Sequence, residues 1–221
     1  TMSVRIAVLI SGRGRNLEAI AAACADGRID GQIVRVLSSR ADAGGLAFAQ
    51  EQGLPVTVIE SKAFNDRSAY DAALSAQLKQ DAPDIIVLAG FMRILTPGFV
   101  VQWLGRMLNI HPSLLPRHPG LHTHQRALEA GDREHGATVH FVTAALDGGP
   151  LVLQGAFTVP PQAASSELAE RVMQDIELKI FPQALSWLLR GELCLLEGAA
   201  VLRGQTLSVP CTLDDLEQAF Q

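Results

Sequence analysis

The first hundred residues alternate short, wholly apolar runs with segments of helical periodicity. Residues 6–10 are continuously apolar and end at Ser11-Gly12, and apolar positions then recur at helical spacing from Leu17 to Cys24. Such runs are typical of strands buried on both faces of a parallel sheet. The same reading predicts strands at 32–38, 56–59 and 85–89, and helices at 42–52, with Asp42 as N-cap, and at 66–80. This alternation predicts a doubly wound α/β fold with right-handed crossovers.

The pattern changes after Gly90. We expect a short helix from Pro97, strands at 107–110, 139–142 and 151–153, a helix over 165–189 that Pro182 kinks, and a small terminal hairpin at 192–210. Between them, residues 111–122 form a long irregular stretch, of the kind that is usually functional or mobile.

The chain has no repeat or long linker, so the sequence predicts one domain over residues 1–221. Its fold class is α/β, with a single doubly wound, mostly parallel sheet flanked by helices. A Rossmann-like nucleotide- or phosphate-binding half covers about 1–100, and a catalytic half covers about 101–221. The sequence does not distinguish a monomer from a homodimer.

Composition narrows the classes of partner. The chain is 48% hydrophobic and 19% charged, as in globular proteins, and its net charge of −5 gives no electrostatic reason to expect nucleic acid or an anionic membrane. Three scattered cysteines, Cys24, Cys194 and Cys211, lack the spacing of a zinc site. The apolar run at the N-terminus is too short for a signal peptide or a membrane span, which makes a reducing cytoplasm the default location.

A glycine-rich loop, residues 11–16 (SGRGRN), follows the first strand and opens the first helix. Ligands of open α/β sheets bind at the carboxyl ends of strands, and free N–H groups at a helix start favour an anion. Leu17 stands where a dinucleotide fingerprint needs glycine, and no Gly-Lys-Ser/Thr follows for a Walker motif. The loop therefore suggests a single phosphate, and a plain tight turn is the alternative.

All six histidines lie between positions 111 and 140. Either several bind a metal, or one is an acid–base residue that the others support. No Asp or Glu lies between residues 107 and 128, and the spacing fits no common zinc motif, which favours the second interpretation. Asn109 and His111 share one face of a strand and together could hold the oxygen of a tetrahedral intermediate. A buried amide fixed in a core network is the other interpretation of Asn109.

Asp147 lies in the segment LDGGP at 146–150. Asp-Gly is a common turn signal. A turn here could also carry the carboxylate to His111 and favour the charged imidazole. The residues alone leave both interpretations open.

Four segments together resemble the folate-dependent formyltransferases, and among them those of purine synthesis. They are SGRGRNL at 11–17, GFMRIL at 90–95, NIHPSLLP at 109–116 and LDGGP at 146–150, and the likeness runs from Arg5 to about Leu202. The resemblance implies transfer of a formyl group from 10-formyltetrahydrofolate to the amine of glycinamide ribonucleotide, without a metal. Asn109 and His111 would stabilise the oxyanion, and Asp147 would charge His111 and relay the amine proton.

The resemblance also assigns binding residues. The substrate phosphate would lie against Gly14, Arg15 and Asn16, and Glu177 would bind the ribose hydroxyls. The folate would contact Arg67, Met92, Arg93, Ile94 and Leu95, with residues 143–147 closing over the pterin and a cis peptide before Pro116. Two positions depart from the family pattern: Arg15 replaces a small hydroxyl residue, and Leu178 replaces a histidine.

Three rival functions fit part of this pattern. Formyltetrahydrofolate hydrolases share the three catalytic positions, but they carry an extra N-terminal domain, whereas this chain starts at its first strand. Transfer-RNA formyltransferases carry an extra C-terminal domain, and only about forty residues follow Pro182 here. A non-catalytic phosphate- or nucleotide-binding module would need only the first loop, and would leave Asn109, His111 and Asp147 unexplained.

Overall fold

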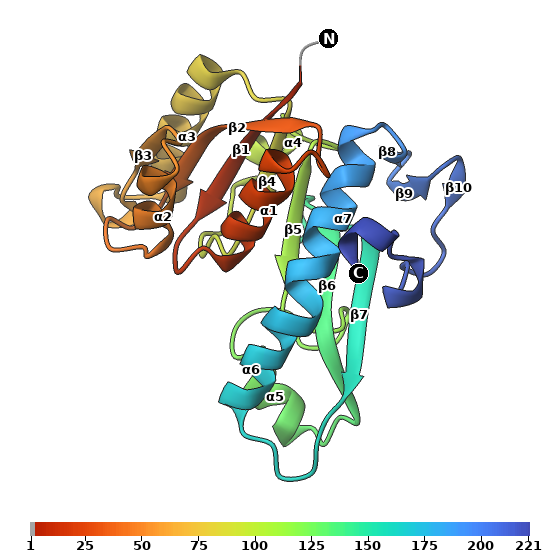
Figure 1. Ribbon diagram of the computed structural model, residues 1–221. Helices are drawn as coiled ribbons and strands as arrows, with labels where there is room; N and C mark the ends of the chain where they lie inside the picture. Colours follow the sequence, from red (N-terminus) through yellow and green to blue (C-terminus); the bar gives the residue numbers. More distant parts are fainter. Residues whose placement is uncertain (1–2) are drawn as a thin grey trace. The chain divides into compact units, whose positions relative to one another are not determined.

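The computed structural model describes residues 3–221 (Figure 1). These form two compact units that divide between Asn109 and Ile110. The first unit contains parallel strands β1 (Val4–Ile10), β2 (Gly31–Ser38), β3 (Val56–Val58) and β4 (Ile85–Leu88), and β5 (Met107–His111) begins in it. Its helices are α1 (Arg15–Ala25), α2 (Gly45–Glu51), η1 (Ser61–Ala63), α3 (Arg67–Asp81) and α4 (Pro97–Val101). The predicted alternation of strands and helices is confirmed.

Local chemistry explains where two of these helices begin. The Asp66 carboxylate accepts a hydrogen bond from the Ala69 N–H at 2.8 Å and caps α3, and Thr96 caps α4 in the same way. β1 is fully buried over its last five residues, as its apolar run predicts. The loop at residues 11–16 follows directly after β1.

The predicted N-cap of α2 is wrong. Asp42 is exposed and pairs with Arg40 at 2.9 Å, while α2 begins at Gly45 without a side-chain cap. A backbone contact fixes this start instead, because the Gly45 N–H donates to the carbonyl of Gly12 at 3.0 Å. A Cβ at Gly45 would lie 2.7 Å from Ile10 Cδ1, so only glycine permits this approach.

The second unit contains the long antiparallel pair β6 (Glu134–Phe141) and β7 (Leu151–Thr158), and helix α5 (Thr123–Glu129), which the sequence did not predict. Helical segments α6 (Ser165–Arg171), η2 (Val172–Glu177) and α7 (Leu178–Leu189) then run along β6 and β7 (Figure 1). Short strands β8 (Leu193–Leu196), β9 (Ala199–Leu202) and β10 (Gln205–Thr206) form a separate antiparallel sheet, which extends the predicted hairpin by a strand. Two short turns, η3 (Leu213–Asp215) and η4 (Gln218–Phe220), follow.

Strands β1 to β7 form one sheet in the order β3-β2-β1-β4-β5-β6-β7. The result is a mostly parallel sheet flanked by helices, as predicted. The division into a single domain with halves at about residue 100 stays a prediction. Among the described residues, no helix is long and apolar enough to cross a membrane.

The long C-terminal helix is interrupted before the proline that was expected to kink it. Its irregular turn is the π-helical segment η2, at 172–177, and Pro182 lies inside α7. Gly155 on β7 faces this segment, and a Cβ there would lie 2.6 Å from Ile176 Cγ2. The wider π turn thus packs closely on β7, and buried Glu177 lies at its end.

A network of charged groups joins the C-terminus to α7. The Glu217 carboxylate accepts hydrogen bonds from the Arg190 guanidinium at 2.6 and 2.9 Å and from Trp187 Nε1 at 3.3 Å. The bonds from Arg190 lower the pKa of Glu217 to about 2. Arg203 also reaches Glu217, at 3.2 Å.

We expect Glu217→Gln to lower the free energy of unfolding by about 1 kcal/mol at pH 7. Because the folded pKa is depressed, this stabilisation is complete above the ordinary glutamate pKa and is lost as the pH falls towards 2. Urea unfolding of both proteins at pH 7 and pH 3 should show a smaller difference at pH 3. The exposed control Glu51→Gln should change little at either pH, and an equal loss at both pH values for Glu217→Gln would contradict this account.

Candidate functional site

The end of β5 carries the predicted oxyanion pair. Asn109 is half-buried and His111 is buried, and they lie two positions apart on one strand. Side chains two apart on a strand point to the same face. The predicted juxtaposition of a carboxamide and an imidazole is therefore present.

Asp147 lies beside His111. Its Oδ1 is 3.6 Å from His111 Nδ1, and the two side chains are only 10% and 8% exposed. Its Oδ2 accepts a hydrogen bond from the Gly120 N–H at 2.8 Å, which fixes the carboxylate. The predicted proximity of Asp147 and His111 is confirmed, and Asp147 also lies in a turn. Its catalytic role stays a prediction.

The turn that carries Asp147 depends on its glycines. Asp147 itself has a positive φ of 51°. A Cβ at Gly149 would lie 1.8 Å from the carbonyl oxygen of Phe141, a distance that no side chain can adopt. Gly149 therefore allows the chain to return closely to β6 and presents Asp147 to His111.

The irregular stretch after β5 is anchored by polar groups on β6 and β7. The Thr138 hydroxyl donates to the Ser113 carbonyl at 2.8 Å and accepts from the Leu115 N–H at 3.1 Å. The Gln154 amide donates to the Leu115 carbonyl at 2.7 Å. The peptide between Leu115 and Pro116 is cis, as the resemblance implied. Sequence reasoning missed Thr138 and Gln154, although Gln154 is a polar residue directly after the apolar run 151–153.

Burial favours the neutral form of three of the other histidines. Burial lowers the pKa values of His124, His135 and His140, that of His135 to about 4. His124 Nδ1 and His135 Nε2 lie 2.8 Å apart and share one hydrogen bond. These three histidines are packed among other residues of the fold. This agrees with the interpretation that one histidine is the acid–base residue and the others are structural. Among the residues that the structure describes, no cluster of three His, Cys, Asp or Glu side chains could hold a metal.

In the first unit, the loop between β1 and α1 is built for close backbone contact. Gly14 has a φ of 79° and precedes α1, and a Cβ there would lie 2.8 Å from Gly45 Cα. Arg15 is half-buried and Asn16 is buried at the first turn of α1. The N–H groups of this first turn give the loop the character of an anion site.

The segment 90–95 lies against the same loop. The Ser11 hydroxyl accepts a hydrogen bond from the Met92 N–H at 2.8 Å and lies 2.6 Å from the Ser39 hydroxyl. Ser11 thereby links the predicted phosphate loop to the predicted folate segment, a role that the sequence did not reveal. The Met92 and Ile94 side chains are exposed.

The side chain of Arg93, in the same segment, is held by packing on an aromatic ring. The Arg93 guanidinium lies over the buried Tyr70 ring, 4.4 Å from its centre. Tyr70 belongs to α3, and exposed Arg67 stands at the start of the same helix. Leu95 is half-buried. The predicted folate residues of the first unit therefore come from α3 and the 90–95 segment.

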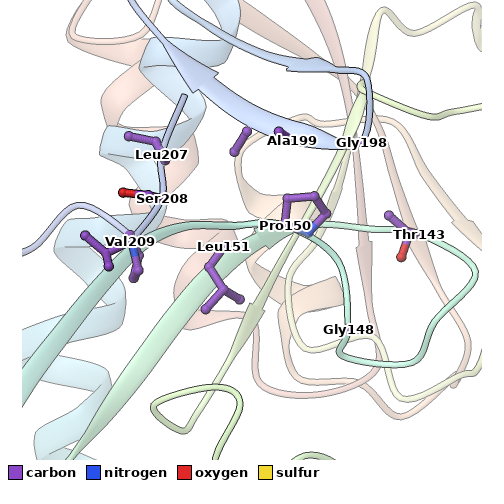
Figure 2. A pocket seen from close by; sticks show the side chains of 11 residues that line it. Thr143, Gly148, Pro150, Leu151, Gly198, Ala199, Leu207, Ser208 and Val209 are labelled. Carbon is purple, nitrogen blue, oxygen red and sulfur yellow. The ribbon is translucent and has the colours of Figure 1, made fainter. Parts of the chain in front are cut away.

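A pocket of about 520 Å³ lies between the turn that carries Asp147 and residues of the C-terminal segment 198–210. Figure 2 shows Thr143, Gly148 and Pro150 of this turn on one side, and Ala199 and Leu207 among the residues opposite. Among the described residues that line it, none is charged. The pocket gives the turn open space on that side.

Comparison with known proteins agrees with this geometry. Residues 4–185 match the formyl transferase family model. The chain belongs to the formyl transferase family.

The relatives are more specific. The chain is 50% identical to the phosphoribosylglycinamide formyltransferase of Escherichia coli K12, over 92% of this chain and 96% of that protein. It is 45% identical to the Haemophilus influenzae protein of the same name, over 92% and 95%. The crystallised phosphoribosylglycinamide formyltransferase of Coxiella burnetii superposes with a TM-score of 0.90 at 42% identity, over 96% of this chain and 99% of that one.

Proposed function

We propose that this chain transfers a formyl group from 10-formyltetrahydrofolate to the amine of glycinamide ribonucleotide, in purine biosynthesis. One observation carries the proposal: the buried His111–Asp147 pair at the end of β5, with Asn109 on the same strand face. The name of its relatives supports the choice of acceptor. The proposed reaction needs no metal.

The chemistry follows from the charges at the pair. The acceptor amine attacks the formyl carbon, a C–N bond forms, and negative charge develops on the formyl oxygen. The Asn109 amide and the Nδ1–H of charged His111 stabilise this oxyanion. The Asp147 carboxylate stabilises the imidazolium and accepts the proton that the amine loses, which passes to the departing folate nitrogen as its C–N bond breaks.

The proposed binding residues differ in the part of the substrate that they contact. Gly14, Arg15 and Asn16 bind the phosphate through backbone N–H groups and the Arg15 charge, which takes the place of a hydroxyl contact. Glu177 binds the ribose hydroxyls. The backbone of 90–95, Arg67 and the turn at 143–147 hold the folate.

We expect Gly14→Ala to raise the KM for glycinamide ribonucleotide about tenfold and to leave the KM for the folate unchanged. The added Cβ would lie 2.8 Å from Gly45 Cα at a φ of 79°, so the phosphate loop must shift. A loss of one hydrogen bond to a charged group gives this magnitude. Gly12→Ala is the matched control, because its Cβ meets nothing within 4 Å. Equal KM values for the two variants would argue against phosphate binding by this loop.

The rival activities predict different products. A hydrolase would release formate from the folate without an acceptor, and a binding module would turn over neither compound. Chromatography of a reaction with both substrates should yield formylated glycinamide ribonucleotide in amounts equal to the tetrahydrofolate produced. Formate in place of the formylated amide would identify a hydrolase.

A further inference from the structure

The second nitrogen of His111 faces a single backbone acceptor. His111 Nε2 lies 2.9 Å from the carbonyl oxygen of His118. A carbonyl only accepts hydrogen bonds, so Nε2 must carry a proton in both the neutral and the charged ring. The neutral ring then has no hydrogen on Nδ1, the nitrogen that faces Asp147. An Nδ1–H donor exists only in the imidazolium, which is the form that an oxyanion needs.

The His118 carbonyl is held in place from several directions. His118 has a φ of 52°, a left-handed conformation that is unfavourable for a residue with a side chain. The Ser113 hydroxyl lies 2.6 Å from the Arg117 carbonyl and 3.1 Å from the His118 carbonyl. The His118 side chain extends to the Asp132 carboxylate, with Nε2 2.7 Å from Oδ2.

The pair of His118 and Asp132 is itself well shielded and anchored. Their side chains are 15% and 17% exposed. Asp132 follows α5, and its N–H donates to the Ala127 carbonyl at 3.1 Å. The carboxylate therefore has a fixed position from which to hold a side chain of the irregular stretch 112–122.

We propose that His118 and Asp132 form a positioning pair, which holds the backbone carbonyl that fixes the protonated nitrogen of His111. The pair does not touch the substrates. It acts through His111 by keeping Nδ1 directed to Asp147 and to the reacting oxygen. The catalytic part of this proposal rests on the proposed transfer reaction, while the effect on the His111 ring does not depend on it.

Asp132→Ala should release the His118 side chain and free its carbonyl to move. Nitrogen NMR of histidine-labelled protein, with the His111 signals assigned by their loss in His111→Asn, should show the neutral ring protonated on Nε2 in the wild type. In Asp132→Ala we expect a mixture of the two tautomers. The kcat for formyl transfer should fall on the order of tenfold, with both KM values within about twofold.

Three further variants separate positioning from a general loss of structure. Asp132→Asn keeps an acceptor for His118 and should restore most of the turnover and the single tautomer. His118→Phe removes the same hydrogen bond from the other side and should give the tautomer mixture, so it serves if Asp132→Ala does not fold. Glu129→Ala removes another carboxylate, at the end of α5, whose described partner is Gln125. Glu129→Ala should change neither the His111 tautomer nor kcat.

The outcomes are distinct. An Nε2-protonated His111 in folded Asp132→Ala would overturn the positioning role, whatever the turnover. A tautomer mixture with wild-type kcat would overturn its catalytic consequence. If the wild type itself transfers no formyl group, the proposed function fails, and the tautomer measurement still decides whether the pair positions His111.

Discussion

Asp147→Asn should lower kcat by about three orders of magnitude and leave the fold intact. The carboxylate is nearly buried, 3.6 Å from His111 Nδ1, and held by the Gly120 N–H. An amide of the same size keeps the space filled but removes the charge that stabilises the imidazolium and the base that takes the amine proton. Loss of positioned acid–base assistance is worth about 10²–10⁴ in rate.

Steady-state kinetics with both substrates test this expectation. The KM values should change little, because Asp147 acts on the transition state and not on binding. Asp214→Asn, an exposed carboxylate in η3, is the matched control and should retain wild-type turnover. A folded Asp147→Asn protein with wild-type kcat would remove the role assigned to the carboxylate.

Asn109→Ala should lower kcat by about 10²–10³, the usual cost of one oxyanion donor. Asn109 lies two positions before His111 on β5. In the proposed reaction both donors act on the same developing charge. Removing the carboxamide leaves His111 as the remaining donor of the pair.

The combination with His111 separates catalysis from packing. Residues that act as a unit are strongly non-additive, so Asn109→Ala with His111→Asn should cost far less than the product of the two single effects. Thermal unfolding controls for the half-buried position of Asn109. If folded Asn109→Ala loses less than fivefold in kcat, the oxyanion role falls and the core-network interpretation of this residue stands.

Hydrophobic periodicity was sufficient for the elements of the first unit because their strands are buried on both faces. Residues 6–10 and 85–88 admit no other interpretation once helices separate them. The predicted start of the helix at residue 66 was off by only one residue, because the local hydrogen bond of the Asp66 carboxylate caps α3 there. The proximity of Asn109 and His111 could be predicted because side chains two positions apart on a strand point to the same face.

Features that depend on distant parts of the chain could not be read in this way. Asp42 has the right residue type for a cap, but a backbone contact between Gly45 and Gly12 decides where α2 begins. The π turn at 172–177 follows from packing over Gly155. Ser11 acquires its role from Met92, a contact that only the fold brings about.

The central claim is formyl transfer to an amine, and the dependence of folate turnover on the acceptor tests it most directly. Tetrahydrofolate formation from 10-formyltetrahydrofolate should be measured with and without glycinamide ribonucleotide, with Asp147→Asn as the inactive control. We expect rapid turnover only when the acceptor is present, with one formylated product for each folate consumed. Equal turnover without the acceptor would contradict the account and indicate a hydrolase.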